Sequence, residues 1–152
     1  MKSDETFDLT TYFPYQIGRV GTYLEEAATR ALKSKGITIL EWRVLGTLLS
    51  RKSCSMGELS DVTAIPVTAL SRLVGSMERK GTVARRRSSS DARVVNASLT
   101  SRGRTLALRL IPAARVREKS LTSLLSANET RVLRTAIARI YCALHDDIRS
   151  LS

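Results

Sequence analysis

The stretch from Pro66 to Lys80 combines a polar stripe with an Arg side chain, in a spacing that suits contact with DNA bases. Thr68, Ser71 and Arg72 fall on one face of a helix, and apolar residues fall on the other. A helix that enters the major groove needs short hydrogen-bonding side chains and an Arg that can fork onto guanine or phosphate. Val67 would meet a thymine methyl group. The alternative is a surface helix whose polar face is only solvated.

A run of basic residues follows this helix and favours a nucleic-acid partner. Arg85, Arg86 and Arg87 lie on one expected strand, and Arg93 begins the next one. A basic hairpin after such a helix can straddle the DNA backbone and place an Arg in the minor groove. Phosphate contacts suit the three consecutive arginines better than base reading does. Asp91 lies two residues before Arg93. Taken by themselves, the two would form a surface ion pair, worth at most about 1 kcal/mol.

The charge of the whole chain agrees with a polyanionic partner. Its 152 residues hold 25 Lys and Arg against 14 Asp and Glu, a formal net charge of +11. Residues 72–104 contain nine basic side chains but only two acidic ones, Glu78 and Asp91. This clustering predicts a basic face, whose partner would be nucleic acid or an anionic membrane surface. Aromatic residues make up only 5% of the chain, which argues against RNA-binding sheets and single-strand stacking grooves.

Other kinds of site find little support in the composition. Cys54 and Cys142 are far apart in the sequence and His145 is the single histidine, so we expect no disulfide framework and no metal set. The two cysteines would be small apolar fillers, and His145 an exposed or interface residue rather than a catalyst. No cofactor is expected, and an enzyme would want a Cys–His pair, paired carboxylates or a phosphate-binding glycine-rich loop. We find no secretory signal and no run of about 18 apolar residues, and therefore expect a cytoplasmic protein.

Three capping boxes mark where helices of the surrounding fold begin. The boxes pair Thr38 with Glu41, Ser55 with Glu58, and Ser126 with Glu129. Apolar periodicity then predicts helices over residues 10–35, 38–50, 55–63, 66–80, 100–125 and from 126 to near the end of the chain. Pro112 is expected to kink the fifth of these helices. Residues 83–87 and 93–99 read as two strands around a polar turn.

These elements predict a mainly α fold with a small β-hairpin wing. We interpret it as a winged helix-turn-helix with N- and C-terminal helical dimerisation arms. Residues 1–35 would form the N-terminal dimerisation helix, residues 36–100 the DNA-binding lobe, and residues 101–152 the C-terminal dimerisation helices. The last helix would bury its apolar face, which the sequence places on Leu133, Ile137, Ile140, Tyr141, Leu144 and Ile148.

Several short fragments of this chain resemble the MarR family (multiple antibiotic resistance regulators). They include ITILEWRVLGTL at residues 37–48, SRLV at 71–74, ERKG at 78–81, DAR at 91–93 and LTSRG at 99–103. Each fragment is weakly specific, but their order and spacing together are specific. One departure is Ala64-Ile65-Pro66, which lacks the polar helix cap that the family often has there. The operator sequence therefore cannot be carried over from relatives.

The resemblance implies roles for the residues introduced above. Thr68, Ser71 and Arg72 would lie in the major groove, Arg93 would be the wing arginine, and Asp91 would orient it through a charge-assisted pair. The predicted DNA contacts are Val67, Thr68, Ser71, Arg72, Arg85, Arg86, Arg87, Ser90, Asp91 and Arg93.

Proteins similar to this one pair their terminal helices into homodimers and often release DNA when a small anionic aromatic molecule or thioester binds. The candidate effector-binding residues are Tyr12, Tyr15, Arg19, Tyr23, Trp42 and Arg43. An Arg among tyrosines could hold a carboxylate or a phosphate. Alternatively, the tyrosines are dimer-interface residues, Trp42 is part of the core, and the terminal helices wrap their own domain.

The sequence therefore predicts a DNA-binding transcriptional regulator, a repressor rather than an enzyme. It would bind a pseudo-palindromic operator as a homodimer and be released by a small ligand. The alternative is a sequence-independent architectural DNA-binding protein without a ligand, which the net charge would suit equally well.

Overall fold

A computed structural model describes residues 7–88, 91 and 93–150 of the chain. It divides into two compact units, residues 1–107 and residues 108–152, and α5 runs across the boundary between them. The predicted division into dimerisation arms and a DNA-binding lobe concerns function and stays a prediction. The elements are α1 (Phe13–Lys33), α2 (Ile39–Arg51), β1 (Ser53–Ser55), α3 (Met56–Thr63), α4 (Val67–Arg79), β2 (Val83–Arg87), β3 (Val95–Leu99), α5 (Ser101–Thr122) and α6 (Ala127–Ser150).

The capping boxes begin helices where the sequence predicts them. In α2, the Thr38 hydroxyl accepts from the Glu41 backbone N–H at 3.1 Å, and the Glu41 carboxylate accepts from the Thr38 N–H at 2.8 Å. Ser55 and Glu58 make the same reciprocal pair at the start of α3. Ser126 and Glu129 make it before α6. These local bonds satisfy amides that a helix start leaves without partners.

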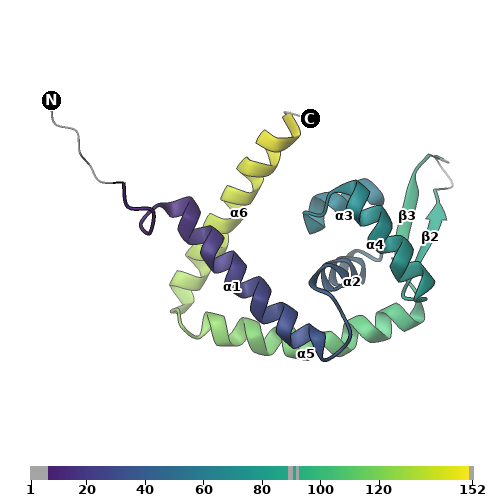
Figure 1. The fold of residues 1–152 in the computed structure, drawn as a ribbon, viewed down its shortest axis with the longest axis horizontal. Helices are drawn as coiled ribbons and strands as arrows, with labels where there is room; N and C mark the ends of the chain where they lie inside the picture. Colours follow the sequence, from purple (N-terminus) through teal and green to yellow (C-terminus); the bar gives the residue numbers. More distant parts are fainter. Residues whose placement is uncertain (1–6, 89–90, 92, 151–152) are drawn as a thin grey trace. The chain divides into compact units, whose positions relative to one another are not determined.

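The core of the first unit lies between α2, α3, α4 and the sheet (Figure 1). Its largest fully buried side chains are Leu45, Leu48, Leu59, Leu70, Met77, Val44, Val74 and Val83. Trp42 is only half-buried, at the edge of this core. Cys54 is buried, as predicted, and burial raises the pKa of its thiol. Cys142 on α6 is exposed, so the prediction that it fills a buried position is wrong for the single chain.

The sheet has three strands in the order β1-β3-β2, both pairings being antiparallel. The sequence predicts the β2–β3 hairpin, called the wing from here on (residues 83–99), but not β1. Cys54 of β1 faces Ala97 of β3 across the pairing. A three-residue strand has too little periodicity to be read from sequence, and its partner lies more than 40 residues away.

The turn between α3 and α4 gives the helix-turn-helix its shape. Ala64 adopts a left-handed conformation, with φ at 55°, and ends α3. The carbonyl oxygen of Ile65 accepts a hydrogen bond from the Ser60 hydroxyl at 2.7 Å, which closes the turn. Pro66 precedes the first residue of α4 and provides no side-chain cap, in agreement with the departure noted in the sequence.

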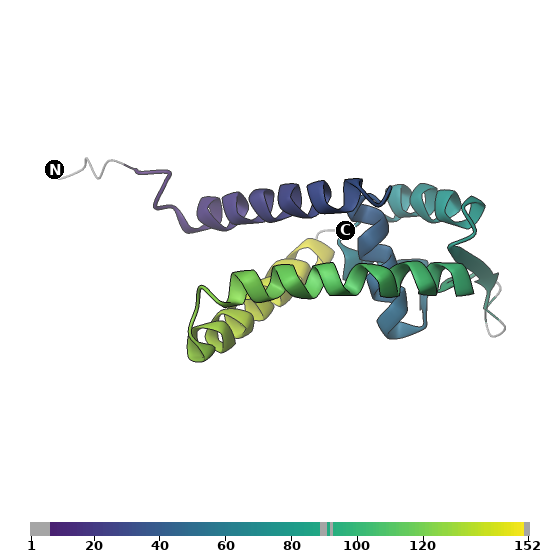
Figure 2. The ribbon, with the colours of Figure 1, turned by 90° about the horizontal axis from the view of Figure 1, so that it is seen from below.

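The first helix, α1, is a single unbroken helix whose N-terminal part extends away from the other helices of its unit (Figure 2). Within α1, all of whose residues the structure describes, Leu32 is the only buried side chain. The helix ends before Gly36, whose φ of 67° explains why glycine stands there. α1 therefore leaves most of its apolar side chains in contact with solvent in the single chain.

In the second unit, α5 stays helical through Pro112 and is followed by α6. The Arg134 side chain on α6 bonds to Glu118 on α5 at 2.6 Å, which ties the two helices together. The predicted buried face of α6 is wrong for the single chain, where Leu133, Ile137, Tyr141 and Leu144 are 48–58% exposed. Ile140 is half-buried, and the side chain of Ile148 lies outside those that the structure describes. A period of 3.6 identifies an apolar face but does not say which surface covers it.

An ion pair between a buried carboxylate and a half-exposed lysine joins the start of α2 to the residue that follows α4. The Lys80 ammonium lies 2.6 Å from Glu41 Oε1, and the Glu41 side chain is only 5% exposed. Burial raises the pKa of Glu41, but hydrogen bonds from Lys80 and Thr38 outweigh it and leave the pKa below its ordinary value. The Glu41 carboxylate therefore stabilises the folded chain while it is ionised.

We expect Lys80→Ala to lower the free energy of unfolding by about 1–3 kcal/mol, since it leaves a buried carboxylate without its cation. The half-exposed Lys80 places the value toward the lower end. Because the folded pKa of Glu41 is depressed, the stabilisation is present above the ordinary Glu pKa and is lost as the pH falls through the folded pKa. Urea unfolding of the unmodified protein and of Lys80→Ala, at pH values across this titration, measures the difference in the free energy of unfolding. Lys35→Ala removes the same charge from an exposed position, and an equal effect there would contradict the assignment.

Candidate nucleic-acid interface

The polar stripe of α4 is exposed, while the opposite face of the helix is buried. Leu70, Val74 and Met77 are fully buried against the core of the first unit, and Leu73 is half-buried. Val67, Thr68, Ser71 and Arg72 are all exposed on the other side. Four of the predicted DNA contacts are therefore brought together on one accessible surface. We call α4 the recognition helix below.

The wing lies next to the recognition helix (Figure 1), and its arginines divide between the two faces of the sheet. Side chains alternate along a strand, so Arg85 shares a face with the buried Val83, while Arg86 lies on the opposite face. The cross-strand neighbour of Arg85 is the buried Ala97, and that of Arg86 is Asn96. Consecutive positions in the sequence therefore do not make a single surface of three arginines.

Arg85 is held in an ion pair with Glu78 in the last turn of the recognition helix. Its Nη2 lies 2.6 Å from Glu78 Oε2, and its Nε donates to the same oxygen at 2.8 Å. The backbone N–H of Arg85 donates to Glu78 Oε1 at 3.2 Å. The guanidinium lowers the pKa of Glu78 and keeps the carboxylate ionised. In the sequence, Glu78 stands out only as one of two acidic residues within the basic stretch, and its pairing with Arg85 is not predicted.

At the tip of the wing, the Asp91 carboxylate accepts a hydrogen bond from the backbone N–H of Arg93 at 2.9 Å. The Val94 N–H donates to the Asp91 carbonyl at 3.0 Å, so Asp91 shapes the turn through two bonds. The Arg93 side chain is exposed. The pairing of the Asp91 carboxylate with the Arg93 guanidinium stays a prediction, and Ser90 lies outside the described residues.

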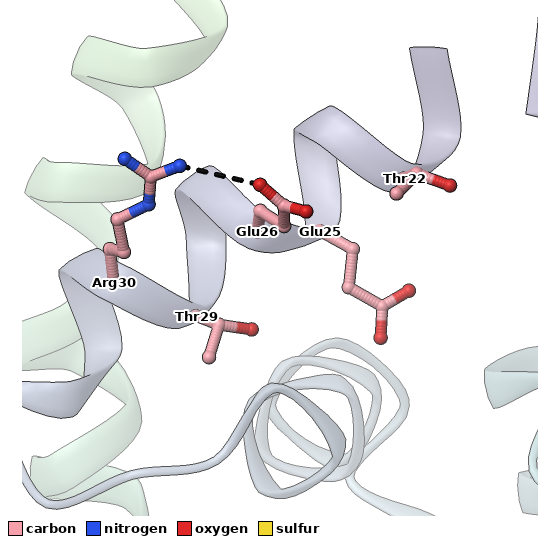
Figure 3. Close-up of a pocket in the computed structure, with 5 residues that line it drawn as sticks. All are labelled: Thr22, Glu25, Glu26, Thr29 and Arg30. Carbon is pink, nitrogen blue, oxygen red and sulfur yellow. Dashed lines mark hydrogen bonds and ion pairs between the residues drawn. The ribbon is translucent and has the colours of Figure 1, made fainter. Parts of the chain in front are cut away.

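The six predicted effector-binding residues come from α1, the residue before it, and α2. The Arg19 guanidinium lies over the Tyr15 ring, 5.8 Å from its centre. Arg43 is paired with Glu25 at 3.4 Å, which links α2 to α1. A shallow hollow on α1 is lined by Thr22, Glu25, Glu26, Thr29 and Arg30 (Figure 3). None of the six residues lines this hollow, so their role stays a prediction.

Residues 7–88, 91 and 93–150 contain no group of three or more His, Cys, Asp or Glu side chains placed to hold a metal ion. Over the same residues, no helix has both the length and the apolar character needed to cross a bilayer.

The recognition helix, its helix-turn-helix and the basic wing define a winged helix-turn-helix DNA-binding protein. A model of the MarR family matches residues 35–94, which run from the start of the α2 region into the wing. The chain belongs to the MarR family of transcriptional regulators. The family assignment expected from the sequence fragments is therefore confirmed, together with the mainly α, winged fold.

Known proteins resemble the chain over most of its length. The HTH-type transcriptional repressor Rv2887 of Mycobacterium tuberculosis is 29% identical over 126 residues, covering 83% of this chain and 91% of that protein. The crystal structure of the MarR family regulator SPO1453 from Silicibacter pomeroyi is 28% identical, with a TM-score of 0.76 over 88% of this chain and 98% of that one. NadR in complex with 4-hydroxyphenylacetate shares the fold at 20% identity, with a TM-score of 0.75 over 93% of this chain and 98% of that one.

Proposed function

We propose that this regulator is a cytoplasmic repressor that binds a pseudo-palindromic operator as a homodimer. The observation that carries the proposal is the exposed face of the recognition helix, where Thr68, Ser71 and Arg72 point away from a fully buried opposite face. These are the side-chain types that read base edges in the major groove, and Val67, 51% exposed, is suited to a thymine methyl group. The relative Rv2887 is named a repressor, which favours repression as the action of this chain.

The wing would supply the remaining contacts. Arg86 and Arg87 are exposed and suit phosphate groups, which position a protein on DNA without reading its sequence. The exposed Arg93 at the tip suits the minor groove, where the negative potential is enhanced in narrow segments. The recognition helix would therefore determine which site is bound, and the wing would contribute affinity at every site.

The homodimer is supported by apolar side chains that the single chain leaves exposed on its terminal helices. On α1 these are Phe13, Ile17, Val20 and Leu24, and on α6 they are Leu133, Ile137, Tyr141 and Leu144. Each set recurs at three- and four-residue steps, so it forms a continuous stripe. An exposed apolar stripe of this kind marks a protein interface. A two-fold axis would repeat the recognition helix about 34 Å away, one turn of DNA further.

The operator proposal is tested by stoichiometry. Sedimentation of the protein with a short duplex from the DNA upstream of its own gene should give two chains per duplex. Loss of symmetry between the half-sites, introduced by scrambling one of them, should weaken binding strongly. One chain per duplex, or equal affinity for the scrambled duplex, would contradict a dimer on a palindromic site.

We further propose that a small anionic aromatic molecule releases the DNA. Arg19 lies over Tyr15 on α1, so a cation and an aromatic face stand together on an exposed surface. Tyr23 is a further candidate on α1, Tyr12 directly precedes this helix, and Trp42 and Arg43 lie on α2. NadR is described in complex with 4-hydroxyphenylacetate, a carboxylate of this class. A carboxylate beside Arg19 would gain a charge-assisted hydrogen bond.

Arg19→Ala should therefore weaken the response to 4-hydroxyphenylacetate. The concentration that half-dissociates the DNA complex should rise about tenfold, as expected for one hydrogen bond to a charged group. Fluorescence anisotropy of labelled operator measures this concentration. Arg30→Ala, which removes an exposed cation paired with Glu26 on the same helix, is the matched control. Equal shifts in both variants, or no release from the unmodified protein, would argue against the site.

A further inference from the structure

We propose that Glu78 and Arg85 form a clamp that fixes the wing to the recognition helix. In this role Arg85 is a positioning residue and not a phosphate contact. The inference rests on the proposed DNA-binding surface and goes beyond it, because it assigns different tasks to three consecutive arginines. Glu78, an acidic residue beside a basic surface, then supports DNA binding instead of opposing it.

The Arg85 side chain binds one carboxylate oxygen of Glu78 through two nitrogens, and the Arg85 main chain binds the other oxygen. Two nitrogens of the Arg85 guanidinium, Nε and Nη2, contact Glu78 Oε2 at 2.8 and 2.6 Å. The other carboxylate oxygen, Oε1, accepts from the Arg85 backbone N–H at 3.2 Å. Glu78 therefore bonds both to the side chain and to the main chain of the same residue. A carboxylate bonded in this way fixes the strand itself, which a simple surface ion pair would not do.

The surroundings hold the Arg85 side chain over the recognition helix. A side chain added at Gly75 would place its Cβ 3.9 Å from Arg85 Nη2 and 3.9 Å from Arg79 Nη1, so both guanidinium groups lie above this residue. Arg85 is 36% exposed and Glu78 is 37% exposed. The carboxylate neutralises the guanidinium there, and a phosphate contact would have to displace it. Arg86, on the opposite face of β2, has no such bond among the described contacts.

The clamp acts where the wing begins. Thr82, just before β2, donates from its hydroxyl to the Met77 carbonyl at 3.0 Å, and Lys80 is bonded to Glu41. Those contacts fix the chain before the wing, while the Glu78–Arg85 clamp fixes β2 itself. The direction in which the wing leaves the recognition helix is thereby set, and with it the position of Arg87 and Arg93. Loss of the clamp should displace the wing without unfolding the core.

Glu78→Gln tests the proposal by the sign of its effect. Removing a negative charge close to DNA should strengthen binding on charge grounds alone. If Glu78 positions the wing, the variant should instead bind the upstream duplex about tenfold more weakly, the loss of one well-placed charged contact. Glu26→Gln removes a carboxylate from an exposed ion pair on α1 and serves as the control. Equal or tighter binding by Glu78→Gln would overturn the clamp.

Arg85→Lys provides a second, independent arm. Lys keeps the charge and can bind a phosphate, but it lacks the planar fork and the Nε donor. The clamp predicts that Arg85→Lys weakens binding as much as Glu78→Gln does, and that the double variant is no weaker than either. A phosphate contact predicts nearly unchanged binding for Arg85→Lys, which would overturn the proposal.

Both arms are measured with folded protein, confirmed by its circular dichroism spectrum. The affinity of each variant is measured on random duplex as well as on upstream duplex. The clamp predicts weaker binding by both variants on both duplexes. If the unmodified protein fails to prefer its upstream duplex, the operator proposal fails, whereas the clamp still stands or falls by the sign of Glu78→Gln.

Discussion

Gly103→Ala is expected to destabilise the folded chain by about 3 kcal/mol, a large fraction of the stability of a domain of this size. Gly103 lies in the first turn of α5, and its backbone packs directly on the chain that leads into the wing. A Cβ at this position would overlap the carbonyl oxygen of Thr82, a backbone atom that no side-chain rotation can move away. The substitution must therefore shift α5 or the start of the wing.

The contacts around Gly103 show why such a shift is costly. The Thr100 hydroxyl accepts from the Gly103 N–H at 3.0 Å and donates to the Gly81 carbonyl at 2.7 Å. The Thr100 N–H donates to the Thr82 carbonyl at 3.2 Å. These bonds join the end of β3, the start of α5 and the turn before β2, so a displacement at Gly103 disturbs all three.

Gly46→Ala is the matched control for this prediction. Gly46 lies inside α2, where an added Cβ meets nothing within 4 Å. Alanine there should raise the free energy of unfolding by up to about 1 kcal/mol, because it is the better helix former. Urea unfolding midpoints measure both variants. A Gly103→Ala protein as stable as the unmodified chain would show that α5 is not packed against Thr82 as described.

Arg72→Ala is expected to cost about 1–3 kcal/mol of binding free energy to the operator, which is roughly ten- to a hundredfold in affinity. Arg72 is exposed in the middle of the polar stripe of the recognition helix, where its guanidinium can fork onto a guanine. Its loss should also relax the preference for one base pair of the site. Anisotropy titrations against a series of single-base variants of the operator measure both effects.

Arg86→Ala tests whether the wing contributes affinity without base recognition. Arg86 lies on the wing, on the face of the sheet away from the recognition helix, and is proposed to contact phosphate. Its loss should weaken binding to all sequences alike. It should also reduce the slope of the logarithm of the binding constant against the logarithm of the salt concentration by about one, as expected for one lost phosphate contact. If Arg72→Ala and Arg86→Ala weakened cognate and random duplex equally, the division of labour between the recognition helix and the wing would be wrong.

Local signals in the sequence were sufficient for most of the helices. The box of Thr38 and Glu41 is formed within four residues, so its chemistry is visible without knowledge of the fold. The amphipathic period of α4 likewise identified which face is buried, as Leu70 and Val74 confirm. Elements that depend on distant partners were harder to read. β1 is defined only by its pairing with β3, and a pattern of three residues is too short to predict a strand.

The candidate site shows the same limit. The types and spacing of Thr68, Ser71 and Arg72 placed them on one helix face, which the structure describes as exposed. The pairing of Arg85 with Glu78 could not be predicted in this way, because Glu78 lies on α4 and Arg85 on β2. Their side chains meet only through the path of the turn that joins these two elements. The exposure of α6 was also unpredictable, since an apolar stripe looks the same whether its own domain or a second chain covers it.

Sequence-specific recognition by the face of α4 is tested by competition between two DNA duplexes. Labelled duplex from the region upstream of the gene is bound to the protein at about 150 mM salt and displaced with unlabelled upstream or random duplex. We expect random duplex to compete at least about a thousandfold less well, as specific regulators do. If random duplex competes as well as upstream duplex, the protein binds DNA through charge alone, and its recognition helix does not read the operator sequence.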